Sequence, residues 1–358
     1  MRFTSVAPLA AAAFAAFGVA GGSAFADADR KVSGPHVHEN LAIYFIHGNS
    51  ADGPAPLTLA EALAKGRVQV IETGRVNELQ IENTGDEEVF VQAGDIVKGG
   101  KQDRVLTVSL VLPPRSGSIP IASFCVEQGR WSARGGEDQA KFTSATDALP
   151  SSRALAIMAA PPSAEPQGMR PAGGPVQQRT GGDTASKQQR MWESVARMQT
   201  ELSASVNTRV AAPQSATSLQ LSLENANLKE AQAAYVAAIE RAGEQESDVL
   251  GYIVAINGKT VSANIYPSNA LFRKMWPKQL AAAATEAIGE KSPVTGKAPA
   301  APTPVVAREF LAEAEKGAAQ ERETALRMRQ ETRDSDGALY NETRSAAGRW
   351  LHKNYLRK

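Results

Sequence analysis

Residues 248–266 predict a β-hairpin in the C-terminal half of the chain, and their sequence is D-V-L-G-Y-I-V-A-I-N-G-K-T-V-S-A-N-I-Y. Asn257 and Gly258 lie between two apolar runs, and both residue types tolerate the positive φ angles that a two-residue hairpin turn requires. Pro277 is expected to kink a later helix or to mark its restart. Amphipathic helices are predicted on both sides of the hairpin, one beginning at Ser186, one centred on 231–241 and one containing Trp276.

Short strand patterns fill the N-terminal half. L-A-I-Y-F-I, residues 41–46, is a continuous apolar run typical of a buried strand. Thr58 stands three residues before Glu61, and this capping box predicts a short helix at 59–65. The expected fold class is therefore α+β, with a mostly antiparallel sheet assembly in the N-terminal half and amphipathic helices plus a β-hairpin in the C-terminal half. The other strands are predicted at 67–72, 77–83, 88–93, 104–112 and 119–127.

Changes in composition divide the chain into segments. Residues 1–26 are predicted to be a signal peptide, and residues 27–290 a single α+β domain. Within that domain, residues 150–186 are rich in Pro, Gly, Ser and Gln and have few large apolar side chains, so a disordered insert is expected there. Residues 291–307 form a Pro-rich linker, and residues 308–358 are expected to form a charged helical tail with a weak apolar face.

The first residues of the chain have the layout of a secretory signal peptide. Arg2 precedes a long uncharged run that ends in A-F-A at Ala26. We therefore expect a secreted or periplasmic protein, cleaved after Ala26 and without stable membrane insertion afterwards. The length of the apolar run leaves a retained membrane anchor as the alternative, although glycines make its second half a poor hydrocarbon span.

The balance of charges argues against nucleic acid as a partner. The full chain has 39 Lys and Arg against 38 Asp and Glu, and cleavage of the predicted leader would remove Arg2 and leave no formal net charge. Capture of a phosphate backbone requires a basic surface. Cys125 is the only cysteine, so an intrachain disulfide is excluded, and its place within a predicted strand indicates a buried, inert thiol.

A polar turn is predicted at G-G-K-Q-D-R. Glycine N–H groups that no Cβ shields, together with a Lys and an Arg, are suited to hold a phosphate or a carboxylate. The segment is not a P-loop, because it lacks the G-x-x-x-x-G-K-[ST] spacing and leads into a strand. A bulged turn with solvated charges explains the same pattern. The candidate ligand-binding residues in this turn are Gly99, Gly100, Lys101, Gln102, Asp103 and Arg104.

Glu127 ends a predicted strand on a partly apolar face and is the candidate catalytic residue. Burial would raise its pKa and suit it to general acid or base catalysis, and the alternative is an ion pair with a nearby arginine. Arg130 and Trp131 follow closely and are expected to complete a shallow ligand-binding surface with the glycine turn. No cofactor or metal site is predicted, because His36 and His38 share one side of an extended segment without the further ligands that zinc requires.

Several motifs together form a pattern shared with a known family. They are T-L-A-E-A-L-A-K-G, V-F-V-Q-A-G-D-I-V-K-G-G-K-Q-D-R and C-V-E-Q-G-R-W, followed by G-Y-I-V-A-I-N-G-K and the Trp276 helix. In these motifs residues 40–288 resemble the ARG and rhodanese-phosphatase-superfamily-associated protein domain family. The resemblance implies that the glycine turn and the Glu127 segment belong to one fold and meet in space. The family name records an association with ADP-ribosylglycohydrolases and rhodanese-like phosphatases and implies no reaction for the domain itself.

These patterns lead us to expect a secreted or periplasmic domain that binds a small anionic ligand or a partner protein. The alternative is a metal-independent hydrolase or transferase in which Glu127 acts as general acid or base while Lys101, Gln102 and Arg104 hold the substrate. A structural envelope protein is the second alternative, suggested by the Pro-rich segments and the charged tail. An open pocket beside Glu127 would favour binding or catalysis, whereas a closed ion pair with Arg104 would favour a structural role.

Overall fold

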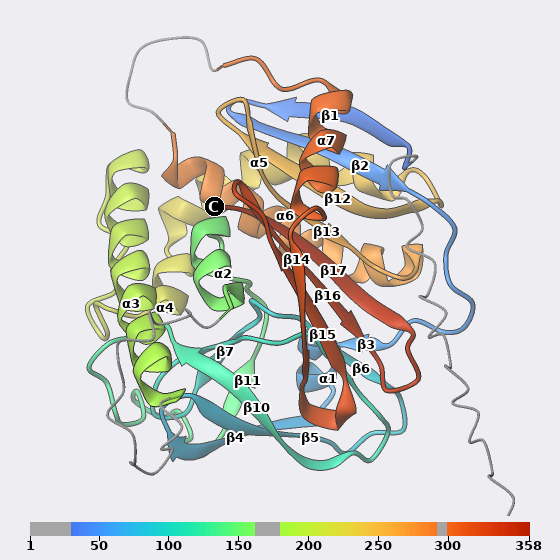
Figure 1. The fold of residues 1–358 in the computed structure, drawn as a ribbon. Helices are drawn as coiled ribbons and strands as arrows, with labels where there is room; N and C mark the ends of the chain where they lie inside the picture. Colours follow the sequence, from blue (N-terminus) through green and yellow to red (C-terminus); the bar gives the residue numbers. More distant parts are fainter. Residues whose placement is uncertain (1–29, 162–179, 292–298) are drawn as a thin grey trace, which may run out of the picture.

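The computed structural model describes residues 30–161, 180–291 and 299–358 and has the predicted α+β fold (Figure 1). Within these ranges the strands pair into three sheets, and every strand pairing is antiparallel except one short pairing in the smallest sheet. The predicted signal peptide, residues 1–26, lies outside the described residues.

The largest sheet takes strands from both ends of the described chain. The predicted hairpin is confirmed at its centre, where Asn257 and Gly258 have φ angles of 50° and 76°. The hairpin inserts between the N-terminal and the C-terminal strands, so its strands are buried on both faces. The strand order is β1 (Val32–His38), β2 (Leu41–His47), β12 (Val249–Ile256), β13 (Lys259–Ile265), β17 (Trp350–Arg357), β16 (Ala338–Arg344), β15 (Arg329–Asp334) and β14 (Ala318–Glu323).

Two smaller sheets form the N-terminal half, as the alternating patterns predicted. Their strands are short and almost wholly buried on one face, which fits apolar residues at every second position. The six-stranded sheet has the order β11 (Phe142–Ser144), β7 (Ile96–Gly99), β8 (Arg104–Leu106), β10 (Gly117–Cys125), β5 (Glu78–Asn83) and β4 (Val68–Arg75). The three-stranded sheet has the order β3 (Leu57–Thr58), β6 (Val89–Val91) and β9 (Leu110–Leu112).

The helices largely follow the predicted signals. The capping box is confirmed, since Thr58 Oγ1 accepts a hydrogen bond from the Glu61 N–H at 3.2 Å and the Glu61 carboxylate accepts one from the Thr58 N–H at 2.7 Å. The Trp276 helix continues through Pro277 without interruption. No helix in the described ranges is long and apolar enough to span a bilayer. The helices are α1 (Leu59–Ala64), α2 (Ser152–Ala159), α3 (Thr180–Ser205), α4 (Leu219–Leu223), α5 (Ala226–Glu244), α6 (Asn269–Gly289), α7 (Pro304–Ala314) and a 3-10 turn, η2 (Ala325–Arg327).

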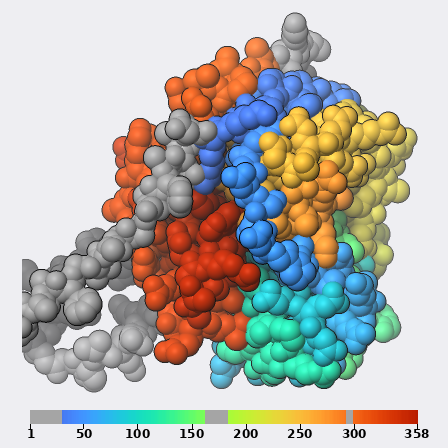
Figure 2. Space-filling model, turned by 90° about the vertical axis from the view of Figure 1, so that its right-hand side faces the viewer, coloured from blue at the N-terminus to red at the C-terminus, as the bar shows by residue number. Residues whose placement is uncertain are grey.

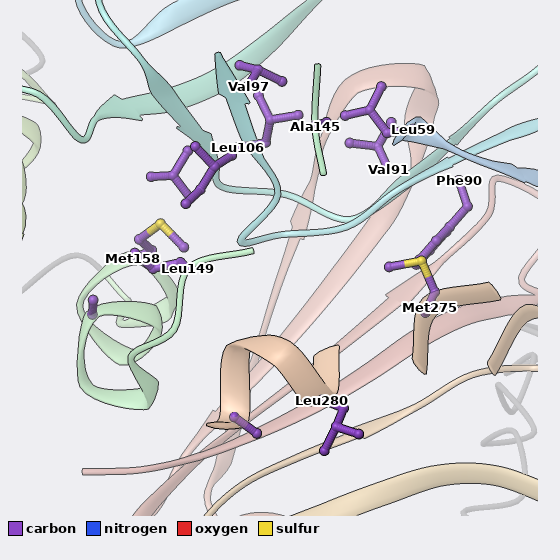
Figure 3. Packing of buried hydrophobic residues seen from close by; sticks show 14 of the residues in the cluster. Leu59, Phe90, Val91, Val97, Leu106, Ala145, Leu149, Met158, Met275 and Leu280 are labelled. Atoms are coloured by element: carbon purple, nitrogen blue, oxygen red, sulfur yellow. The ribbon is translucent and has the colours of Figure 1, made fainter. Parts of the chain in front are cut away.

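The two faces of the largest sheet pack against different partners. Phe45 of β2 belongs to a large cluster, where it contacts Phe272 and Trp276 of α6 at ring-centroid distances of 6.3 and 5.4 Å. This cluster continues into the small sheets and α2, whose side chains point into a shared interior (Figure 3). Tyr44 lies on the opposite face, in a smaller cluster covered by α7. The larger cluster therefore joins both halves of the chain.

The prediction of a charged helical tail at 308–358 is wrong for most of its length. Only α7 is α-helical in this described segment, and α7 begins inside the predicted linker. Thr303 caps it by accepting a hydrogen bond from the Val306 N–H at 3.3 Å. Residues 318–357 form β14 to β17, and Figure 2 shows this segment, in red, on the same surface as the N-terminal segment, in blue. The strands have an unusual buried face, because polar residues fill it: Gln330, Thr332, Asn341, Thr343 and His352.

The first part of the predicted insert at 150–186 is helical. It forms α2, which is capped by Ser151 Oγ accepting a hydrogen bond from Ala154 N–H at 3.1 Å. Ala154 and Met158 of α2 are buried in the core, so this short apolar run has enough contact area to be ordered. Residues 162–179 of the insert and 292–298 of the linker lie outside the described residues.

Candidate functional site

The two sequence motifs meet in space, as the resemblance implied. The G-G-K-Q-D-R turn joins β7 to β8, and β8 pairs with β10 so that Arg104 lies opposite Cys125. Glu127 follows β10, and its carboxylate accepts a hydrogen bond from the Asp103 N–H at 3.1 Å. Strand pairing therefore brings both polar segments to the same end of the six-stranded sheet.

Glu127 is buried inside a network of arginines. Its carboxylate lies 2.7 Å from Arg130 Nε and 3.7 Å from Arg134 Nη1, and it accepts a hydrogen bond from the Ser215 hydroxyl. Burial alone would raise the pKa of Glu127, but the hydrogen bonds from Arg130 and Ser215 outweigh burial and hold the pKa below its ordinary value. The Glu127 carboxylate is therefore ionised, and the arginines balance its charge. This geometry matches the interpretation of Glu127 as a member of an ion pair.

Asp103 is a second buried carboxylate in the same network, and Arg134 is its bidentate partner. Both of its carboxylate oxygens accept hydrogen bonds from Arg134 at 2.7 Å, and Ser218 Oγ donates a further one at 2.7 Å. Burial and the nearby charge of Glu127 nevertheless raise the pKa of Asp103. Sequence reasoning missed Arg134, Ser215 and Ser218, because no local pattern connects these loop residues with the glycine turn.

The other cations of the two motifs are also occupied. Arg104 is buried, forms a 3.2 Å ion pair with Glu72 and donates to the Gln102 carbonyl at 2.9 Å, and the Gln102 side chain is itself buried. Arg130 donates to the carbonyls of Gly100 at 3.0 Å and Gly99 at 3.3 Å. Both guanidinium groups therefore bind groups of the protein itself, which leaves them little capacity for a ligand.

Trp131 is the exposed part of this region. The residue is 42% exposed, the Lys101 ammonium lies 5.2 Å from the ring centroid, and the Arg104 guanidinium lies 5.6 Å from it. Cation–π contacts of this kind hold the indole in place. Lys101 and Trp131 are thus the candidate residues that stay accessible from outside.

The two glycines of the turn allow close packing. Gly99 has a φ of 124°, and a Cβ there would lie 2.9 Å from the Lys141 carbonyl oxygen. Gly100 has a φ of 57°, and a Cβ there would lie 2.6 Å from the ring of Phe142 on β11. The glycines are therefore required for the approach of β11, and their N–H groups are directed to protein acceptors: Gly99 to Asp103 and Gly100 to the Lys141 carbonyl.

A cavity of about 300 Å³ lies elsewhere, between α2, α3 and α6. Sequence reasoning did not identify it, because its walls come from three separate helices and the turn of the β12–β13 hairpin. The polar residues that line it are Ser151, Arg153, Ser194, Arg197, Glu201, Asn257, Thr285, Glu286 and Glu290.

Glu286 is one of the residues that line this cavity. Its Oε1 accepts hydrogen bonds from the Ser152 N–H at 2.7 Å and from Ser152 Oγ at 2.6 Å, so the carboxyl group also caps the N-terminus of α2. Burial raises the pKa of Glu286 to about 7 despite these hydrogen bonds, and the nearby Glu290 raises it further. Arg153 and Arg197 are exposed at the cavity, and within the described part of the chain neither makes an ion pair or a hydrogen bond.

One group of side chains is close enough to hold a metal ion. His47 Nδ1 lies 2.9 Å from Asp248 and 3.5 Å from Glu246, while its Nε2 contacts Ser33 Oγ at 2.7 Å. The hydrogen bond with His47 holds the pKa of Asp248 below its ordinary value. Both ring nitrogens of His47 have partners within the protein, Asp248 and Ser33, and these contacts account for the geometry without a metal.

Comparisons with known proteins identify the family but no relative of established activity. The match to the family extends over residues 29–356, which is almost the whole chain and includes the C-terminal strands that the sequence motifs did not reach. No curated protein and no solved structure matches the chain. The chain belongs to the family of the ARG and Rhodanese-Phosphatase-superfamily-associated Protein domain.

Proposed function

We propose that this protein binds a small anionic ligand in the cavity between α2, α3 and α6. The observation that carries the proposal is the pair of arginines, Arg153 and Arg197, at a cavity of about 300 Å³ that Glu286 also lines. This volume lies at the lower end of the range of small-molecule sites. Guanidinium groups are well suited to bind carboxylates and phosphates, because their N–H groups match the geometry of two oxygen acceptors.

The chemistry of the cavity narrows the class of ligand. Glu286 has a pKa of about 7 and is substantially protonated at neutral pH, so it can donate a hydrogen bond to an anion. Glu201 and Glu290 also line the cavity and would repel a ligand that offers only negative charge. We therefore favour an anion that also carries O–H or N–H groups, such as a hydroxy acid, an amino acid or a sugar phosphate.

Catalysis at the same cavity is the second candidate function. The predicted hydrolase or transferase required a glutamate with a raised pKa, and Glu127 lacks this property because arginines keep it ionised. Glu286 has it, and the cavity gives it space for a substrate. A general acid or base with a pKa near the working pH is the most effective.

A thermal-shift screen of inorganic phosphate, citrate, amino acids, hydroxy acids and sugar phosphates tests the binding proposal. A ligand at one hundred times its Kd should add about 2.7 kcal/mol of stability. The double variant Arg153→Gln and Arg197→Gln should lose this shift. Arg115→Gln is the matched control, since Arg115 forms an exposed ion pair with Asp86. A shift that survives in the double variant, or a screen without any shift, would overturn the proposal, and the second result would favour a structural role.

We also propose that the protein is exported. The layout of residues 1–26 supports this, with Arg2 before the apolar run and small residues at the cleavage site before Asp27. Export would place the cavity in the periplasm or the surrounding medium.

A further inference from the structure

Three polar side chains form a continuous line of hydrogen bonds between the smallest and the largest sheet. Ser109 directly precedes β9, His352 lies on β17 and Asn264 lies on β13. The Ser109 hydroxyl is 3.0 Å from His352 Nδ1, and His352 Nε2 is 3.0 Å from Asn264 Oδ1. No feature of the sequence suggested this group, because its members are separated by most of the chain.

The surrounding hydrogen bonds define the direction of proton donation. Asn264 Nδ2 donates to the Tyr252 hydroxyl at 2.7 Å, and Asn264 Oδ1 accepts from Asn354 Nδ2 at 3.0 Å. The oxygen of Asn264 therefore faces His352, so His352 Nε2 carries the proton. Nδ1 is then an acceptor, and the Ser109 hydroxyl donates to it. This is the arrangement in which an imidazole removes a proton from a serine.

The imidazole and the hydroxyl are both held in place. The His352 ring stacks on Tyr266 at a centroid distance of 5.3 Å and an angle of 28°, and the edge of Phe90 contacts it from another direction. Ser109 Oγ accepts a hydrogen bond from the Ala93 N–H at 3.0 Å. A fixed serine and a fixed base satisfy the geometric requirement for nucleophilic catalysis.

A second cavity adjoins this group, and Ser109 and His352 form part of its wall. Its volume of about 30 Å³ has room for roughly two water molecules. Asn341 also lines it, is 7% exposed, and its Nδ2 has no hydrogen-bond partner within the residues that the structure describes. A buried donor without a partner at a cavity wall is a group that a carbonyl oxygen could satisfy.

We propose that Ser109 is a nucleophile for small acyl esters, with His352 as its general base and Asn264 as the positioning residue. Ser109 Oγ attacks the ester carbonyl carbon while its proton moves to His352 Nδ1. The carbon–oxygen bond to the leaving alcohol then breaks, and the alcohol takes the proton from His352. Water attacks the acyl-serine by the same route in reverse and releases the acid, so no co-reactant other than water is needed.

The small cavity restricts the acyl group to one of about the size of an acetyl group. His352 is neutral at pH 7, which is the form that accepts a proton, but burial lowers its pKa to about 3. Asn264 carries no charge that would stabilise the imidazolium. Both features predict slow turnover, so covalent labelling is a better test than steady-state hydrolysis.

The test uses the full chain and one small probe, 4-nitrophenyl acetate, which transfers an acetyl group. Intact mass should show one adduct, and peptide mapping should place it on Ser109 in the wild-type protein. Ser109→Ala should abolish labelling and His352→Gln should slow it at least 100-fold, whereas Ser118→Ala, at an exposed serine of β10, should label like wild type. Mapping of the wild-type adduct keeps the test valid even where a variant fails to fold.

Two results would overturn the proposal. No adduct at high probe excess would show that the three residues only form hydrogen bonds with one another in the interior, and an adduct on another residue would assign the reactivity elsewhere.

Asn264→Asp tests the positioning role, since a carboxylate should stabilise the imidazolium and raise the labelling rate about tenfold. An unchanged rate in that variant would remove Asn264 from the mechanism. The arginine variants of the α2–α3–α6 cavity leave this site intact, so the two proposals fail independently.

Discussion

Replacement of Glu286 by glutamine should make the free energy of unfolding less dependent on pH. The folded protein raises the pKa of Glu286 from 4.5 to about 7, so it binds this proton more tightly than the unfolded chain does. The associated stabilisation is fully present below pH 4.5 and is lost as the pH rises through about 7. At about 1.4 kcal/mol for each pH unit, the shift corresponds to at most about 3.5 kcal/mol. Glutamine retains an oxygen that accepts both hydrogen bonds from Ser152.

Urea unfolding at a series of pH values from about 5 to about 8 measures this effect. The difference in unfolding free energy between wild type and Glu286→Gln cancels the contribution of the other titrating groups, such as Asp103. As the pH rises, the unfolding free energy of the wild-type protein should fall relative to that of the variant. Glu230→Gln, at an exposed position on α5, is the matched control and should parallel wild type across the range.

A difference between wild type and Glu286→Gln that stays constant with pH would refute the reasoning. It would mean that Glu286 titrates near its ordinary pKa and is solvated within the cavity. Glu286 could then act neither as a hydrogen-bond donor nor as a general acid at neutral pH. The arginines would be unaffected, because their contribution to anion binding does not require a protonated Glu286.

Two further predictions concern other parts of the chain. Arg134→Ala should destabilise the protein by roughly 3 to 5 kcal/mol, since it leaves the buried carboxylate of Asp103 without its bidentate partner. The control is Arg75→Ala, which removes an exposed ion pair. If Arg134→Ala lowered the melting temperature as little as the control does, this result would contradict a structural role for the network. The exported protein should have an intact mass that begins at Asp27, and a mass that includes Met1 would indicate a retained leader.

Local signals in the sequence predicted local structure well. The Asn257-Gly258 hairpin and the Thr58 capping box were predicted because a few adjacent residues determine each of them. The C-terminal strands were missed for a physical reason. Their buried face carries residues such as Thr332 and Asn341, which hydrogen-bond to each other at 2.9 Å, and a polar face that is buried against other polar groups produces no alternation of apolar and polar residues.

The candidate site was predictable only in part. The approach of the glycine turn to Glu127 followed from strand pairing, but the neutralisation of its charges depends on Arg134 and Glu72, which no spacing rule connects to the turn. The cavity at Glu286 was beyond the sequence, because helices distant along the chain form its walls. Sequence motifs identified the segments that are buried together. Only the fold distinguished charged side chains that pair with each other from charged side chains that could bind a ligand.

The place of β17 in the largest sheet determines the order in which the chain can fold. β17 lies between β13 and β16, although two helices and three other strands, α6, α7 and β14 to β16, separate β13 from β17 along the chain. Until it arrives, β13 presents an open edge with unsatisfied N–H and C=O groups, which is a template for pairing with other chains. A chain truncated before Trp350 should therefore aggregate. β17 follows every other strand of this sheet along the chain, so the sheet can close only after all of its other strands have been made.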